Sequence, residues 1–270
     1  MRWALEVLPV LGAGSLTLAH FLTAAAFRRR TGAIVAGLER TAAAEIPSSP
    51  VPPVIQSFAR RAAGGTPVPK IVWLHQTGEI RADPGSAWCS FTAEQVISVH
   101  QPGFAWLARM QALPRLSAHI LDCYIDGEGL LEARLFGSLP LARVTGPEVA
   151  KSELMRYLAE LIWTPHAILH NPKLSWREID ATTVEVSAAS VNGRARVRLI
   201  FENGDIARIE ADDRPRATGR RIRPTPWQAC CDDYREMEGC RIPTWATVSW
   251  VLDDGPFVCW HGRVTAYGMK

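Results

Sequence analysis

From Lys70 to the C-terminus, short apolar or alternating segments are separated by turn-forming residues, and this pattern constrains the fold more than any other feature. Asn192-Gly193 and Asn203-Gly204 are typical of tight hairpin turns, because both residue types tolerate positive φ. Between them Val197, Leu199 and Phe201 alternate with polar residues, as expected for a strand with one buried face. About ten strands with short links indicate an antiparallel meander. The expected strands are 70–81, 88–100, 104–110, 116–125, 130–136, 183–187, 195–202, 206–211, 244–252 and 258–267.

One amphipathic helix interrupts the strands, over residues 146–163. Thr145 and Glu148 have the spacing of a capping box, and Pro165 ends or kinks the helix. Its apolar positions recur at helical spacing and form one stripe: Leu154, Tyr157, Leu158, Leu161 and Ile162. A curved, mostly antiparallel sheet packed on a helix is an α+β fold.

The N-terminal segment carries no charged residue from Val7 to Phe27, and Arg28-Arg29-Arg30 follows directly. This length suits a transmembrane helix, which needs about 20 apolar residues. We therefore expect residues 1–30 to be an uncleaved anchor; a cleaved signal peptide and a buried core helix are the alternatives. The positive-inside rule places the three arginines, and the body after them, in the cytoplasm.

Two further regions follow the anchor. Residues 31–66 form an Ala- and Pro-rich tether with a short helix over 54–62, because the prolines of residues 47–53 interrupt any longer helix. Residues 67–270 form the β-rich domain. Four arginines and one glutamate lie in residues 1–30, so the net charge of +3 belongs to that segment and the rest is neutral. A neutral body argues against nucleic-acid binding.

No sequence motif of a known catalytic, metal or cofactor site is present. The six cysteines do not have the spacing of a common zinc site, so we expect free thiols, no metal and no cofactor. Five arginines between residues 214 and 223 suggest either a solvated loop or a loop that touches anionic headgroups.

Two groups of polar residues are candidates for chemistry. Asp122 and Tyr124 share one face of a strand, where a carboxylate beside a phenol suits acid–base catalysis or simply fixes the strand end. Arg156 and Glu160 lie one helical turn apart, either as a functional ion pair or as a solvated one. Seven of ten tryptophans lie in or beside the expected strands, a pattern that suits either a ligand-holding wall or a tightly packed interior.

A series of short motifs gives the chain a family resemblance. The motifs are Gln76-Thr77-Gly78-Glu79-Ile80-Arg81, Phe91-Thr92-Ala93-Glu94-Gln95, Pro102-Gly103-Phe104-Ala105-Trp106, Asp122-Cys123-Tyr124, Arg156-Tyr157-Leu158-Ala159-Glu160, Pro226-Trp227 and Arg241-Ile242-Pro243. From about residue 54 to its end, the chain resembles a bacterial family of unknown function whose members often carry an N-terminal membrane segment. This resemblance implies a bacterial inner-membrane protein with a single span and brings no known activity.

The order of strands and covering helix is in addition similar to the open half-barrels of lipoprotein carriers of the LolA and LppX type. This weaker likeness implies that a concave apolar face holds acyl chains. On this chain it points to a ligand-binding set that combines aromatic and polar candidates: Trp88, Phe91, Gln95, Trp106, Asp122, Tyr124, Arg156, Glu160 and Trp250. An uncleaved anchor and a cytoplasmic body depart from the carriers' pattern, and a periplasmic body is the alternative.

The leading hypothesis is thus a membrane-anchored protein that binds a membrane lipid or another apolar small molecule in a concave sheet without catalysis. An enzyme that uses Asp122 and Tyr124 on a membrane-derived substrate is the second hypothesis. A structural or partner-binding module is the third, and the interior of the sheet, filled or vacant, distinguishes among them.

Overall fold

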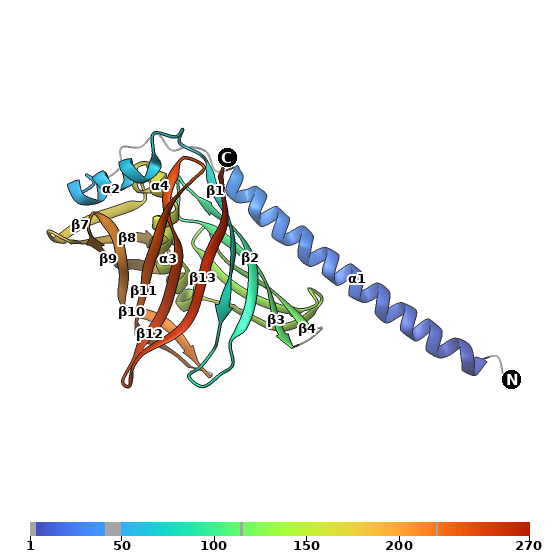
Figure 1. Cartoon of the computed structure of the whole chain (residues 1–270). Coiled ribbons are helices and arrows are strands. Elements are labelled where there is room, and N and C mark those ends of the chain that lie inside the picture. The colour runs from blue at the N-terminus through green and yellow to red at the C-terminus, as the bar shows by residue number, and fades with distance from the viewer. Residues whose placement is uncertain (1–3, 41–49, 114–115, 220) are drawn as a thin grey trace.

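The computed structural model of the chain describes residues 4–40, 50–113, 116–219 and 221–270, and for residues 4–17, 112 and 113 the backbone alone. Its dominant element is one strongly curved antiparallel sheet (Figure 1). The sheet contains thirteen strands, which follow one another along the chain as β1 Ile71–Ile80, β2 Cys89–Ser98, β3 Phe104–Leu113, β4 Leu116–Ile125, β5 Glu128–Leu135, β6 Leu139–Thr145, β7 Leu174–Asp180, β8 Thr183–Ser190, β9 Gly193–Glu202, β10 Asp205–Thr218, β11 Arg221–Met237, β12 Cys240–Leu252 and β13 Gly255–Met269.

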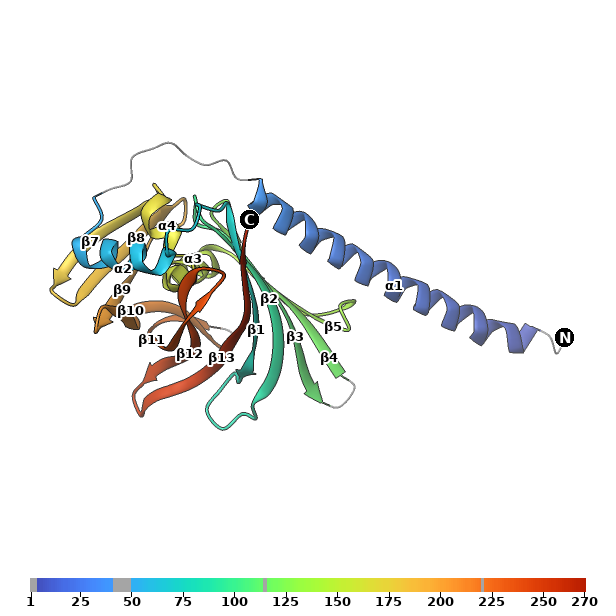
Figure 2. The ribbon, with the colours of Figure 1, turned by 45° about the horizontal axis from the view of Figure 1, so that its top comes forward.

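The sheet consists of two meanders that are joined in its middle. Its spatial order is β6-β5-β4-β3-β2-β1-β13-β12-β11-β10-β9-β8-β7, so that the first strand pairs with the last. The two halves approach each other again at one end, where Asn192 Nδ2 donates to the Gly127 carbonyl over 2.9 Å. The sheet therefore has the form of an open half-barrel (Figure 2). The expected α+β class and the curved antiparallel sheet are confirmed.

The expected number of about ten strands is wrong, because the structure has three further strands, β6, β7 and β11. Every residue of β6 is exposed, so its sequence shows no alternation between buried and exposed positions. Strand β11 contains Pro224 and Pro226, which reduce its strand propensity. Arg214 and Arg216 lie in β10, and Arg221 and Arg223 lie in β11, so these four residues belong to strands and not to the expected loop.

The concave side of the sheet holds the central helices (Figure 2). Helix α3 (Pro147–Ala159) continues into a 3₁₀ turn, η1 (Glu160–Trp163), and then into α4 (Pro165–His170). The expected helix over 146–163 is therefore confirmed, although its N-cap is Gly146 without a side-chain cap, so the capping box of Thr145 and Glu148 does not form. Tyr157, Leu158 and Leu161 are fully buried against the sheet.

Two further helices lie outside this central stack. Helix α2 (Pro53–Ala63) packs with α4 and β12 at one end of the sheet. Helix α1 (Ala4–Glu39) places Phe27 and Leu38 against the outer face of β3 and β4, and its N-terminal part projects beyond the body (Figure 1). Of the prolines that were expected to interrupt a longer helix, Pro47 lies among residues 41–49, outside the described part, whereas Pro50 and Pro52 precede α2 and Pro53 begins it.

The transmembrane helix expected over Val7–Phe27 requires correction. The segment is helical, but in the part of the chain that the structure describes no helix has the length and apolar character needed to cross a membrane. Pro9, Ser15, Thr17 and His20 already lower the hydropathy of the segment.

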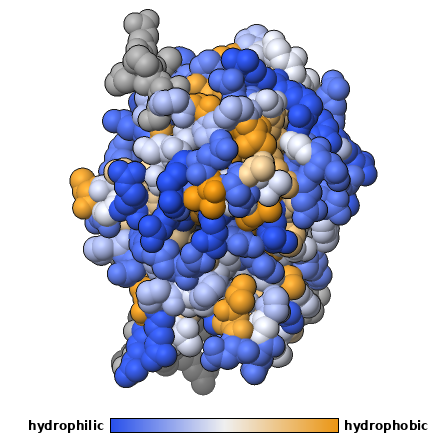
Figure 3. All heavy atoms as spheres, turned by 90° about the vertical axis from the view of Figure 1, so that its left-hand side faces the viewer, coloured by the Kyte–Doolittle hydropathy of each residue, from blue (hydrophilic) through white to orange (hydrophobic). Residues whose placement is uncertain are grey.

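The outer surface near β7 to β10 is mostly hydrophilic, and its hydrophobic residues are scattered in small groups (Figure 3). Charged side chains pair across these strands, as Arg198 does with Glu210 and Asp212. The apolar residues of the same strands face inward, among them Val197, Leu199 and Ile209. In this half of the sheet the convex face is thus polar and the concave face apolar.

Candidate functional site

A cavity of about 420 Å³ lies between the concave face of the sheet and α3–η1. Its volume is in the range of about 300–1,000 Å³ that is typical of small-molecule sites. Strands β1, β3 to β5 and β10 to β13 form one wall, and residues of α3 and η1 form the other. The central helix therefore does not fill the interior of the sheet.

Most of the cavity wall is apolar. Met110, Ile120, Ile162, Ile209 and Val248 supply aliphatic surface. Five tryptophans complete the wall, namely Trp106, Trp163, Trp227, Trp250 and Trp260. An apolar wall with a few polar groups is the usual form of a site for an apolar or amphipathic ligand.

A buried ion pair network joins α3 to the sheet inside this wall. Arg156 Nη1 lies 2.6 Å from Asp122 Oδ2, and Arg156 Nε lies 2.8 Å from Glu160 Oε1. Gln95 Nε2 donates to the second oxygen of Glu160. Burial disfavours the charge of Arg156, but Glu160 and Asp122 outweigh it and raise the pKa of the guanidinium. Arg156 thus has two carboxylate partners inside the protein.

Glu153 is a third carboxyl group beside this network. Burial, together with the negative charge of Asp122, raises the pKa of Glu153 from its ordinary 4.5 to about 8, although Arg214 and Arg156 oppose the shift. Glu153 Oε2 and Asp122 Oδ1 are both buried, and among the described residues the two carboxyl groups interact with each other and with no further donor at these atoms. The surroundings of Glu153 therefore favour its protonated form.

Arg214 reaches the cavity because of a β-bulge. Ala211 pairs with Trp227 and Arg214 pairs with Thr225, so β10 has one more residue than β11 in this interval. The additional residue moves Arg214 onto the concave face, where simple alternation from Ala211 would place Asp213. Its guanidinium lies 4.7 Å from the Trp227 ring centre and 5.8 Å from that of Trp250.

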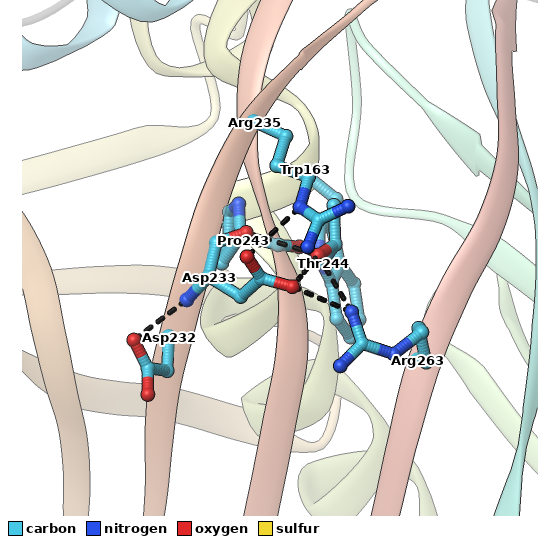
Figure 4. A network of polar contacts seen from close by, with 7 residues as sticks. All are labelled: Trp163, Asp232, Asp233, Arg235, Pro243, Thr244 and Arg263. Atoms are coloured by element: carbon cyan, nitrogen blue, oxygen red, sulfur yellow. Dashed lines mark hydrogen bonds and ion pairs between the residues drawn. The ribbon is translucent and has the colours of Figure 1, made fainter.

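The 3₁₀ turn that closes the cavity is held by hydrogen bonds. Trp163 Nε1 donates to the Pro243 carbonyl over 2.9 Å, and Tyr267 Oη donates to the Trp163 carbonyl over 3.1 Å. The neighbouring residue Thr244 is held by Asp233, which also accepts from Arg263 and Arg235 (Figure 4). These hydrogen bonds lower the pKa of Asp233, first through Arg235 and then through Arg263. The network links β11, β12 and β13 behind the turn.

The structure brings five of the nine expected ligand-binding residues to the cavity wall. These residues are Trp106, Asp122, Arg156, Glu160 and Trp250. Two more lie directly behind the wall: Phe91 stacks on Trp260 with a centroid distance of 5.7 Å, and Gln95 supports Glu160.

Two expected residues do not line the cavity. The ring of Trp88 lies 4.7 Å from that of His261, and Arg81 lies over it at 4.4 Å. Tyr124 is buried, and its hydroxyl group interacts with Ser190 of β8. The structure thus gives Tyr124 a partner other than Asp122, which removes the support for an acid–base pair of these two residues.

Several wall residues were not expected from the sequence, above all Arg214, Trp227, Arg81 and Cys259. Trp227 belongs to one of the family motifs and Arg214 to the arginine-rich segment, but neither pattern shows which side of the sheet a residue faces. The part of the chain that the structure describes contains no group of three or more His, Cys, Asp or Glu side chains placed to hold a metal ion.

A second hollow of about 350 Å³ lies on the outer face beside α1, and its lining includes Arg28, His75, Glu94 and His119. Its wall contains many polar residues, among them several threonines. The inner cavity is therefore the better candidate for an apolar ligand.

Comparison with solved structures finds proteins of low sequence identity. A LolA superfamily protein from Nitrosomonas europaea is 11% identical, with a TM-score of 0.43, and the match covers 80% of this chain and 93% of that one. A DUF1329 family protein from Desulfovibrio piger is 10% identical, with a TM-score of 0.44, over 83% and 94% of the two chains. No curated protein matches the sequence.

Comparison with protein families gives a match over most of the chain. The pattern of DUF6544, a family of unknown function, matches residues 41–262. This range includes the whole cavity wall and all the motifs that carried the resemblance, and it confirms the expectation of a family without known activity. The chain is therefore a member of the DUF6544 family.

Proposed function

We propose that the protein binds a lipid or another apolar small molecule in the cavity between the curved sheet and α3–η1, without catalysing a reaction. The cavity itself supports the proposal, since it has the volume of a small-molecule site and a wall of tryptophan and aliphatic side chains. Apolar ligands gain about 25 cal/mol for each Å² of apolar surface that such a wall removes from water.

Binding is favoured over catalysis by the state of the polar groups. Asp122 is engaged by Arg156, and Tyr124 interacts with Ser190, so neither is placed as the free acid or base that the second hypothesis needs. We propose that the ligand comes from a bacterial inner membrane, which the N-terminal segment contacts. The body then lies in the cytoplasm or in the periplasm.

A fluorescent fatty acid that carries an anthroyloxy group tests this function. We expect saturable binding to the full chain, with energy transfer from the tryptophans of the wall. In the double variant Ala229→Leu with Ala246→Leu, the added side chains fill the cavity, and the affinity is expected to fall by about tenfold or more, equivalent to about 1.4 kcal/mol.

The control is Ala217→Leu, which makes the same change at an exposed position of β10 and leaves binding unchanged. Absence of saturable binding to the wild-type chain would contradict the proposal. Equal affinity of the filled variant and the wild type would place the probe elsewhere and contradict it as well.

A further inference from the structure

Arg214 is a cavity-lining cation that forms no ion pair with the described residues. Within the described part of the chain, no carboxylate lies within 4.0 Å of its guanidinium, although Glu153 and Asp122 are near enough to act on it electrostatically. Only its Nε donates a hydrogen bond there, to Ser152 Oγ over 3.3 Å. An arginine has five N–H donors, so the terminal nitrogens of this fork still lack an acceptor in the described residues.

The surroundings of Arg214 are aromatic and contain few acceptors for its N–H groups. Trp227 and Trp250 place their ring centres 4.7 and 5.8 Å from the central carbon of its guanidinium, which is a cation–π arrangement and supplies no hydrogen-bond acceptor. Burial without a paired anion lowers the pKa of Arg214. A buried charge of this kind gains most from an anion that reaches it in the same water-poor space.

Two other arginines gather at the same end of the cavity. Arg81 also lines it, and its Nε donates only to the Val258 carbonyl, over 2.8 Å. Arg216 lies over Trp250 and Phe257, and its nearest carboxylate, Asp83, is 4.0 Å away. Arg214, Arg216 and Arg81 all act on the thiol of Cys259, so the three cations surround one part of the wall.

The charged residues of the whole cavity wall also include more cations than carboxylates. Its cations are Arg81, Arg156 and Arg214, whereas its carboxylates are Asp122 and Glu160, both of which are bound to Arg156. Burial raises the pKa of Glu153, behind the wall, which favours its neutral form. The wall therefore carries one more cation than carboxylates, and both carboxylates are held at Arg156, so Arg214 and Arg81 are the cations of the wall that lack a bound carboxylate within the described residues.

We propose that Arg214, with Arg81 beside it, binds the carboxylate or phosphate head of an amphiphile whose apolar chain lies along the tryptophan and aliphatic part of the cavity. This inference rests on the proposed function, because it assumes that an apolar chain enters the same cavity. Arginine forks bind carboxylate and phosphate in a bidentate manner, with stronger hydrogen bonds than those between neutral groups.

Four ligands with the same chain and different heads test the inference: dodecanoate, dodecyl phosphate, dodecanol and dodecylamine. Each is titrated against the anthroyloxy probe on the full chain. We expect dodecanoate, dodecyl phosphate or both to displace the probe roughly ten- to hundredfold better than dodecanol, as a hydrogen bond to a charged group allows. Dodecylamine should be the weakest, and the ranking of the two anions identifies the head.

Arg214→Gln should abolish the preference for the anionic head and leave the affinity for dodecanol unchanged. Arg208→Gln is the matched control, since Arg208 lies on the same strand and pairs with Glu210 on the outer face. Arg214→Lys retains the charge without the fork and should give an intermediate preference, which provides a second variant if the glutamine variant does not fold.

Equal binding of dodecanoate, dodecyl phosphate and dodecanol by the wild type would overturn the head-group inference while leaving the proposed function intact. Displacement by inorganic phosphate alone as effective as by dodecyl phosphate would assign the site to a free anion and also overturn it. Failure of all four ligands would contradict both proposals. An unchanged preference in both Arg214 variants would exclude Arg214 as the anchor.

Discussion

At the scale of single residues, the cavity is unusual because apolar side chains surround several buried charges. Arg156 holds Asp122 and Glu160 together, so α3 and β4 are linked through one guanidinium. Each of these charged groups is partly desolvated. Removal of one group is therefore costly, because its partners would remain buried without a counter-charge. The network therefore fixes the position of the wall more than it adds to net stability.

Arg156→Met should expose this cost. The substitution leaves two buried carboxylates without their cation, and we expect a loss of about 3–5 kcal/mol in the free energy of unfolding. Urea denaturation measures it. The same change in Arg177, whose exposed side chain pairs with Glu185, should cost less than about 1 kcal/mol. Similar losses in the two variants would show that the Arg156 network is not effectively buried.

Stability should also depend on pH through Glu153. Its carboxyl keeps its proton up to about pH 8 in the folded state and loses it near pH 4.5 when unfolded. The resulting stabilisation is complete below pH 4.5 and is lost as the pH rises through about 8, because the unfolded state then binds fewer protons. The facing charged groups, Asp122, Arg156 and Arg214, are the ones that act on this titration.

Thermal unfolding between pH 5 and pH 9 measures this effect. The melting temperature of the wild type should fall over that interval more than that of Glu153→Gln, which cannot ionise. Glu148→Gln, at an exposed position of the same helix, serves as the control and should follow the wild type. Parallel curves for the wild type and Glu153→Gln would show that Glu153 does not bind this proton.

How much of the site could be read from the sequence depends on local regularity. Trp106 and Asp122 lie in regular strands, where alternation assigns the inner face correctly. Arg214 follows a bulge that reverses the alternation, and no residue type in β10 marks its position. Trp88 precedes β2, where no strand register applies, and the partner of Tyr124 comes from the distant β8.

At the scale of elements, α3 is seated by one close contact with β5. A Cβ at Gly129 would lie 2.7 Å from the backbone of Ala150, so only glycine allows the helix to approach the strand this closely. On its other side α3 contacts β9 and β10. The helix is thus held between the two halves of the sheet and forms the second wall of the cavity.

Gly129→Ala should therefore displace α3 and destabilise the fold. We expect a loss of about 1–3 kcal/mol, as found when extra atoms are placed in a packed interior. Gly32→Ala in α1 is the comparison, because a Cβ there meets no atom within 4 Å and alanine favours the helix by up to about 1 kcal/mol. Chemical denaturation measures the free energy of unfolding of both variants. An unchanged free energy of unfolding in Gly129→Ala would show that α3 and β5 are not closely packed at this position.

The elements that the sequence predicts best are those with one buried face. The amphipathic helix and the hairpins of β8, β9 and β10 show clear periodicity, and all of them are found. Strand β6 has no buried residue, and β11 combines prolines with charges, so their strand structure depends on neighbours in the sheet and not on their own pattern.

At the scale of the whole molecule, the sheet curves around α3 and η1 and leaves space beside them. The turns at Gly127 and Asn192 meet at one end, α2 and α4 pack together at another place on the body, and α1 lies on the outer face. The cavity is consequently lined by side chains from many parts of the chain. For this reason no single sequence motif indicates the binding site.

The most direct test of the central claim, that this cavity holds a ligand, is native mass spectrometry of the full chain purified from bacterial cells. Organic extraction of the same sample then identifies any bound molecule. We predict an adduct with the mass of an apolar or amphipathic small molecule, strongly reduced in the Ala229→Leu, Ala246→Leu double variant and retained in Ala217→Leu. A wild-type chain that carries no adduct, and takes up none when lipids are added, would contradict the account.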